Sequence, residues 1–247
     1  MTTSDSTTFT GRKAMQRAAA VWFALTLLGQ GLFVAFILAF YYPSTLSGDA
    51  AAWNRKPLIE GYVAGDTAGN FGFAVHVMLA AAMFAAGWLQ LIPSIRTKAP
   101  QIHRWSGRLF ITLALVLALG GLGLVWLRGT WLTLTGAISI SLNAVLIVAS
   151  AVLAWRTALA RDFAAHRRWA LRCFILCGGV WFMRIGYVGW GASTGGLGIA
   201  KGMSGPFDLV WGFGCYLLPL GLLEVWLRAE RSKTERSRYL AAAMAVL

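Results

Sequence analysis

Long apolar runs separated by short polar or basic segments make up most of this 247-residue chain. A helix that crosses the roughly 30 Å hydrocarbon core of a bilayer needs about 20 mostly apolar residues, because each residue rises about 1.5 Å. Six runs meet this requirement, at about residues 18–42, 71–95, 109–127, 134–155, 173–191 and 207–227. We therefore predict an all-α integral membrane protein, a six-helix bundle that forms one transmembrane domain over residues 1–247.

The two ends of the chain differ from the spans in composition. The run that begins at residue 18 is too long for the apolar region of a signal peptide, so we interpret it as a retained first transmembrane helix. Residues 2–10 are polar, and we expect a disordered tail there. Residues 228–238 alternate in charge sign, which favours a helix lying on the membrane surface.

Lysine and arginine are distributed unequally between the two sides of this predicted bundle. Seventeen basic residues fall at the chain ends and in the segments 96–108 and 156–172, whereas Arg55, Lys56, Arg128 and Lys201 fall on the opposite side. Basic residues concentrate in cytoplasmic loops of membrane proteins. We therefore predict that both termini are cytoplasmic and that the protein lies in a bacterial cytoplasmic (inner) membrane.

Two similar basic and aromatic segments indicate an internal repeat. Trp105 and Trp169 are 64 residues apart, as are Arg108 and Arg172, and each pair precedes a long apolar run. We predict that the second and third helices form a hairpin that the fourth and fifth helices duplicate, with the first and sixth helices flanking this core. We call residues 103–108 the first collar and residues 166–172 the second collar.

The overall composition excludes some classes of protein. The chain is 58% hydrophobic and 13% charged, with a mean hydropathy of +0.65. The formal charge of +13 is spread between the apolar runs, so membrane topology explains it better than a nucleic-acid partner does. Cys173, Cys177 and Cys215 lie in apolar segments, which predicts buried, reduced thiols.

Polar residues inside the predicted spans are the first candidates for a site, because a polar group in hydrocarbon is costly unless it is paired. We hypothesise an outer-leaflet pocket in which Asp208 balances Arg184. The candidate residues are His76, Arg184, Asp208, Gln30 and Asn143. In the simpler interpretation, Arg184 extends outward to the membrane surface, Asp208 caps the last helix and His76 donates to a carbonyl group.

The two collars are the second candidate site. Trp105 and Arg108 are three residues apart, as are Trp169 and Arg172, so guanidinium and indole can interact on one helical face. The candidate residues are His103, Arg104, Trp105, Arg108, His166, Arg167, Trp169 and Arg172.

Three ligands suit the collars, alongside a purely structural role. His103 and His166 could hold the iron of one b-type haem, and they would be metal ligands only in that case. The arginines equally suit a quinone or an anionic lipid head group at the cytoplasmic face. The simplest interpretation is that these residues anchor the helices at the interface. His76 lies on the opposite side of the membrane, so a second haem lacks ligands.

The chain contains no recognisable phosphate loop, metalloprotease motif or nucleophile motif. We therefore favour a non-enzymatic accessory or ligand-binding membrane subunit, with protein partners in the membrane as a further possibility. A redox protein that uses the two collar histidines is the first alternative. A small transporter that uses His76, Arg184 and Asp208 is the second.

Several unusual residues occur in an order that resembles a known family. They are His76, Gly87-Trp88-Leu89-Gln90, Pro93, Arg96, His103-Arg104-Trp105, Gly107-Arg108, Ala165-His166-Arg167-Arg168-Trp169, Arg172 and Arg184. Over residues 71–190 the chain resembles the domain of unknown function 2306 family of bacterial multipass membrane proteins. Ala170 departs from the methionine that the family pattern has there. The resemblance implies a multipass membrane protein and carries no assigned activity.

Overall fold

The computed structural model describes residues 4–55, 61–128 and 133–231 and position 243, with side chains from residue 13 onward in the first helix. The regular elements of this part are helical. They are α1 (Ser4–Phe36), a π-helical segment (Ile37–Tyr41), α2 (Tyr42–Leu46), a 3₁₀ segment (Ala50–Arg55), α3 (Thr67–Leu91), α4 (Pro93–Lys98), α5 (Pro100–Trp126), α6 (Leu134–Leu159), α7 (Phe163–Cys177), α8 (Gly179–Thr194) and α9 (Pro206–Arg231).

The helices account for the six predicted spans. Five stretches are each long and apolar enough to cross a membrane: Lys13–Leu46, Thr67–Leu91, Pro100–Trp126, Leu134–Leu159 and Pro206–Arg231. Helices α7 and α8 meet the same requirement only together, as a pair bent by 48°, and correspond to the predicted fifth span. The predicted single helix over 173–191 is therefore wrong in shape. Helix α7 begins earlier, at Phe163. The span is interrupted at Gly178, which is both the C-cap of α7 and the N-cap of α8.

The chain ends also differ from the prediction. Helix α1 begins at Ser4, so the part of segment 2–10 that the structure describes is helical and not a disordered tail. Helix α9 continues to Arg231, and the rest of the predicted surface helix over 228–238 lies outside the described residues.

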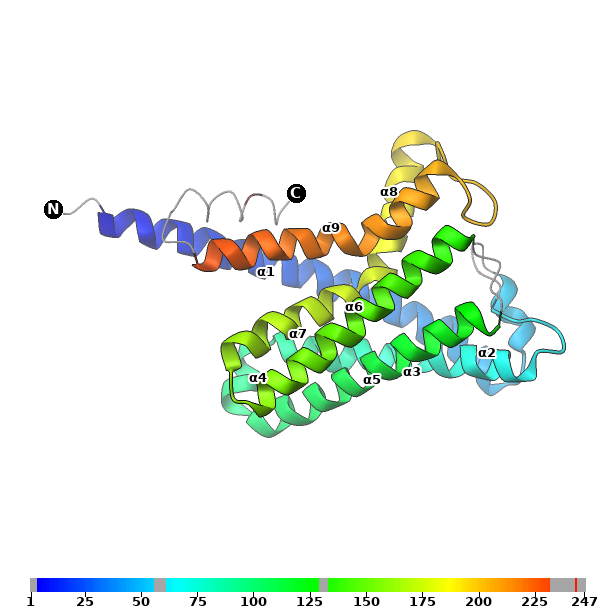
Figure 1. Ribbon diagram of the computed structural model, residues 1–247, viewed down its shortest axis with the longest axis horizontal. Helices are drawn as coiled ribbons and strands as arrows, with labels where there is room; N and C mark the ends of the chain where they lie inside the picture. Colours follow the sequence, from blue (N-terminus) through cyan, green and yellow to red (C-terminus); the bar gives the residue numbers. More distant parts are fainter. Residues whose placement is uncertain (1–3, 56–60, 129–132, 232–242, 244–247) are drawn as a thin grey trace.

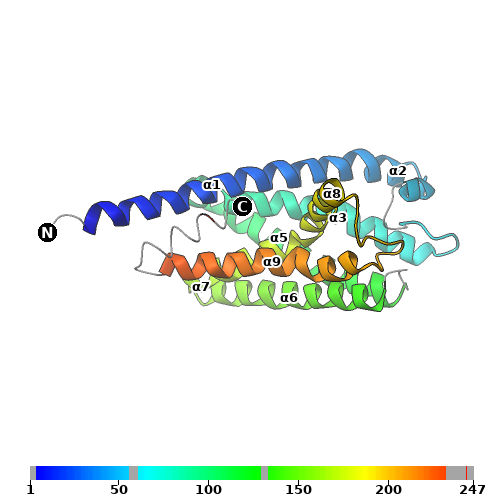
Figure 2. The same ribbon diagram turned by 90° about the horizontal axis from the view of Figure 1, so that it is seen from above.

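Helices α3, α5, α6 and α7 form the core of the bundle, and α1 and α9 lie outside it (Figure 1). The closest packing joins α3 to α5, α5 to α6, and α6 to α7, as the duplicated hairpin predicts. Seen from above, α1 runs along one flank and α6, α7 and α9 along the other (Figure 2). The start of α1, the last residues of α9, α4 and the turn between α6 and α7 lie at one end, which we call the collar end.

Small residues allow the core helices to approach closely, as expected where lipid provides no hydrophobic drive between helices. A Cβ atom added to Gly87 would lie 3.1 Å from the ring of Phe110 and 3.2 Å from that of Phe174. These two phenylalanines occupy equivalent positions in the two repeats, and their ring centroids are 6.2 Å apart. The two repeats therefore pack against each other through phenylalanines at equivalent positions. The three cysteines are buried and free, as predicted.

Arg128 forms hydrogen bonds that connect two segments at the end of the bundle opposite the collars. Its Nε donates to Asp66 Oδ2 at 2.7 Å, and its Nη2 donates to Asn70 Oδ1 at 2.6 Å and to the Gly61 carbonyl at 3.0 Å. Asp66 also caps α3 by accepting from Gly69 N–H at 2.8 Å. One arginine thus ties the end of α5 to the loop that precedes α3.

This contact makes stability depend on pH. The hydrogen bond from Gly69, followed by that from Arg128, lowers the pKa of Asp66 below its ordinary value of 3.8. A carboxyl whose pKa is lowered by folding stabilises the protein above its ordinary pKa, and this stabilisation is lost as the pH falls through the folded-state value. We predict that Asp66→Asn lowers the Tm in detergent at neutral pH, and that the difference from wild type shrinks below pH 3.8.

The control is Asp49→Asn, because the pair between Asp49 and Arg55 is exposed and longer, at 3.4 Å. Exposed ion pairs contribute little to stability, so this variant should unfold like the wild type. An Asp66→Asn protein with the same Tm as the wild type at neutral pH would contradict the prediction.

Candidate functional site

Both collars form the predicted interaction between arginine and tryptophan. The Cζ atom of Arg108 lies 4.8 Å from the ring centroid of Trp105, and that of Arg172 lies 4.5 Å from the ring centroid of Trp169. The two contacts repeat because each pair is three residues apart on a helix, which places both side chains on one face. The collars are therefore alike in their internal geometry.

The second collar is covered by α9. Arg172 donates to the two carboxylate oxygens of Glu224 at 2.6 and 3.0 Å. Arg167 binds Glu230 in the same two-pronged way, at 2.7 and 2.9 Å. Sequence reasoning missed these partners, although a glutamate inside the predicted span 207–227 was a signal that a basic residue must lie opposite it.

The first collar has no such cover. Trp105 is 68% exposed, and Arg104 and Arg108 are also exposed. The ion pairs found among the described residues join Arg55, Arg128, Arg167 and Arg172 to carboxylates, and none includes Arg104 or Arg108. Two segments of similar sequence therefore present different surfaces, one closed and one open.

Polar side chains attach each collar to the preceding helix. Gln90 donates through Nε2 to the His103 carbonyl at 3.0 Å and to Ser106 Oγ at 2.6 Å. In the second repeat, His166 Nδ1 lies 2.8 Å from the carbonyl of Ala154, which is 64 residues after Gln90. A Cβ atom at Gly107 would come within 2.9 Å of Gln90 Oε1, so a larger residue there would displace the Gln90 amide.

His103 and His166 each lie three residues after the first residue of their helix, in α5 and α7. The Nδ1 atom of His103 is buried without a hydrogen-bond partner. If His166 Nδ1 carries the proton that the Ala154 carbonyl accepts, its Nε2 is left with a free lone pair, as in a histidine that binds a metal. No group of three or more metal-ligating side chains occurs among the described residues.

Amide side chains surround the interruption between α7 and α8. A Cβ atom at Gly178 would lie 3.3 Å from Gln30 Nε2, and one at Gly179 would lie 3.3 Å from Asn143 Nδ2. Gln30 is 1% exposed and accepts from Trp88 Nε1 at 2.8 Å. Asn143 Nδ2 is 3.4 Å from the Leu176 carbonyl, and its Oδ1 is buried without a partner.

Arg184 points toward this interruption and not toward the membrane surface. Its Nη1 donates to the carbonyl of Val180, one turn nearer the start of α8, at 2.9 Å. Its Cζ lies 4.4 Å from the ring centroid of Phe33 on α1. The outward extension of Arg184 that the simpler interpretation expected is therefore not observed.

Asp208 does not balance Arg184. Buried at the start of α9, it accepts from Tyr187 Oη at 2.6 Å, from Gly205 N–H at 2.8 Å and from Ala200 N–H at 2.9 Å. Its carboxylate is used to hold the loop between α8 and α9. This contact matches the simpler interpretation, in which Asp208 caps the last helix.

His76 lies apart from the other polar residues, between α3 and α5. Cβ atoms added to Gly120 and Gly121 would lie 3.9 and 3.5 Å from its ring, and its buried Nδ1 has no partner. The expected donation from His76 to a carbonyl is thus absent. Of the five residues predicted to line one pocket, the structure brings Gln30, Asn143 and Arg184 to the neighbourhood of the helix interruption and leaves His76 and Asp208 elsewhere.

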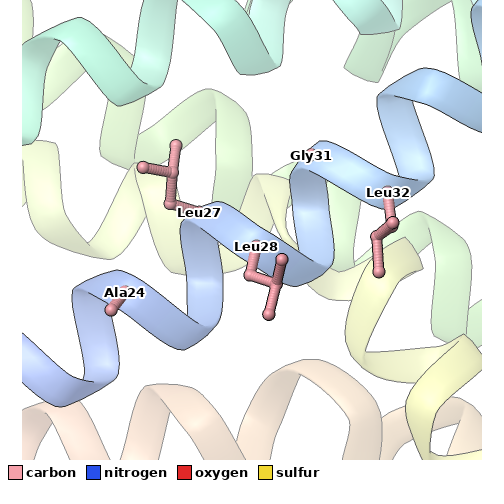
Figure 3. Close-up of a pocket in the computed structure, with 5 residues that line it drawn as sticks. All are labelled: Ala24, Leu27, Leu28, Gly31 and Leu32. Atoms are coloured by element: carbon pink, nitrogen blue, oxygen red, sulfur yellow. The ribbon is translucent and has the colours of Figure 1, made fainter.

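A shallow groove on α1 is apolar throughout (Figure 3). It is lined by Ala24, Leu27, Leu28, Gly31 and Leu32. Leu28 and Leu32 are 63% and 66% exposed, whereas Gln30 on the same helix is buried. This face turns away from the bundle and is typical of a surface that contacts lipid.

The fold and the apolar spans define a multipass helical membrane protein. A family model described as "Predicted membrane protein (DUF2306)" matches residues 73–197, and the chain therefore belongs to this family. The match extends from α3 to the loop after α8, so it includes both collars and the helix interruption. No curated protein and no solved structure matches the chain.

We predict that Glu224→Gln destabilises the protein by about 1–2 kcal/mol, a value between those typical of exposed and buried ion pairs. Glu230→Gln should cost less, because the Arg167 side chain is 48% exposed and that of Arg172 is 17% exposed. Unfolding of the purified variants in detergent would measure both effects.

The double variant Arg172→Met with Glu224→Leu tests whether the unpaired charge of Arg172 causes the destabilisation by Glu224→Gln. Removing both charges leaves no unpaired charge, so this variant should be more stable than Glu224→Gln. Equal stability of Glu224→Gln, Glu230→Gln and the wild type would show that α9 is not held by these pairs.

Proposed function

We propose that this protein is a non-enzymatic membrane subunit whose first collar binds the head group of an anionic lipid. One observation carries the proposal: Arg104 and Arg108 are exposed and outside the ion pairs of the described chain, while the second collar binds two carboxylates. A guanidinium group binds carboxylate and phosphate oxygens through the same fork of donors. The exposed guanidinium groups of the first collar can therefore donate to a phosphate as Arg172 donates to the Glu224 carboxylate.

The surroundings of the first collar favour a lipid head group. Trp105 is exposed beside Arg108, and tryptophan is enriched at the level of lipid head groups. Arg96 and Lys98 on the exposed surface of α4 add positive charge at the same end. The excess of basic residues at this end favours the cytoplasmic leaflet of a bacterial inner membrane, where anionic lipids attract basic segments. A partner protein bound through such lipids would suit an accessory subunit.

The test is the retention of phosphatidylglycerol against phosphatidylcholine by the purified protein, measured by native mass spectrometry. We expect Arg104→Gln and Arg108→Gln each to weaken phosphatidylglycerol retention about tenfold, because each variant loses a charged hydrogen bond to the phosphate that contributes about 1.5 kcal/mol. The matched control is Arg156→Gln, which removes an exposed arginine from the end of α6 at the collar end. An equal loss of phosphatidylglycerol retention in this control would mean that surface charge in general holds the lipid, which would contradict the proposal.

A single b-type haem, or a quinone, between His103 and His166 is the second candidate function. The observation that favours it is the hydrogen bond between His166 and the Ala154 carbonyl, which orients the ring as in many metal-binding histidines. The nearby arginines would suit the haem propionates. This candidate does not need the lipid site, and the two can be separated by experiment.

Visible absorption spectra before and after dithionite, on protein expressed with ample haem, decide the haem candidate. This candidate predicts a Soret band that is lost in His103→Ala and in His166→Ala. His76→Ala should keep the band, because His76 lies between α3 and α5, far along both helices from the collars. A flat spectrum from the wild type would eliminate the haem candidate and leave the lipid proposal unaffected.

A further inference from the structure

Arg184 is a cation deep in the apolar part of the chain. It lies six residues after Gly178 and ten residues before the end of α8, so about 9 Å and about 15 Å along the helix separate it from these points. Its guanidinium turns back toward the interruption, to Val180 and Phe33. Ionisable groups within apolar membrane helices are candidates for a functional role by default.

The protein satisfies few of the donors of this guanidinium. An arginine has five N–H donors, and the hydrogen bond described for Arg184 uses one of them, to Val180. The ion pairs of the described residues do not include Arg184, and Asp208 is occupied by Tyr187, Gly205 and Ala200. A half-buried positive charge without a carboxylate is costly in hydrocarbon, and an external oxyanion would offset that cost.

The position of Arg184 makes it accessible from the lipid. Helix α8 touches α1 lightly, through the Trp181 ring against Gly29 and the Arg184 guanidinium over Phe33. Arg184 itself is partly exposed, and its neighbour Ile185 is 44% exposed. An acyl chain lying against the exposed faces of α1 and α8 could thus bring its head group to the guanidinium.

We propose that Arg184, with Phe33, binds the carboxylate of a single-chain amphiphile such as a fatty acid, which enters from the lipid beside α1 and α8. A phospholipid phosphate keeps its charge and stays at head-group level, whereas a carboxylic acid can enter the hydrocarbon in its neutral form. Arg184 binds the ionised form, and the proton returns to water. The fork of the guanidinium matches a carboxylate with two hydrogen bonds. This site is independent of the collars.

The experiment measures saturable binding of radiolabelled palmitate to the full-length protein in phosphatidylcholine nanodiscs, relative to empty nanodiscs. Arg184→Gln should weaken binding about tenfold, as expected for loss of a two-pronged charged hydrogen bond. Phe33→Leu keeps an apolar side chain and should weaken binding by a smaller factor. Arg156→Gln, which removes an exposed arginine from the end of α6, is the matched control and should bind like the wild type.

A competition on the wild-type protein keeps the proposal testable if Arg184→Gln does not fold. Unlabelled palmitate should displace the label, and methyl palmitate should not, because the ester carries no charge. Three results would overturn the proposal. They are no saturable binding of palmitate, equal displacement of the label by methyl palmitate, and unchanged binding by a folded Arg184→Gln protein. Absence of binding would leave a second copy of the chain as the candidate source of the counter-ion.

Discussion

The interruption of the fifth span at Gly178 is the constraint on which the arrangement of this protein depends. Backbone polar groups inside a bilayer must find partners within the protein, so a broken helix requires polar neighbours. Gln30 and Asn143 lie against Gly178 and Gly179, and Trp88 holds Gln30 in place. Beyond the interruption α8 turns away by 48°, which leaves Arg184 facing α1. In the first repeat, Ala114 stands 64 residues before Gly178 within the unbroken α5.

Differences between the repeats are the source of the candidate sites. The two hairpins share the arginine and tryptophan pairs of the collars and the phenylalanines that meet at the centre. The second collar lies beside a helix that carries Glu224 and Glu230, so Arg167 and Arg172 are neutralised within the chain. The first collar has no corresponding partner among the described residues, so its arginines stay exposed. A duplicated sequence can thus provide one structural contact and one open surface.

The sequence predicted most of the fold because apolar runs and basic segments are local signals. Span number, the pairing of hairpins and the collar contacts follow from hydropathy, residue spacing and helical geometry. The shape of the fifth span was not predicted, since glycine is frequent in membrane helices. The pair Gly120 and Gly121, for example, lies within the unbroken α5. The pocket prediction grouped polar residues by depth alone, so it joined His76 and Asp208 to residues on other faces of the bundle.

The sequence by itself determined that this chain is a multipass helical membrane protein of the DUF2306 family with a repeated collar. Only the tertiary structure decided which charges are neutralised. Glu224 meets Arg172 because α9 packs against α7, and Asp208 holds a loop because Tyr187 and two backbone N–H groups surround it. Such pairings join residues far apart in the chain, and their geometry depends on helix rotation and packing, which hydropathy does not specify.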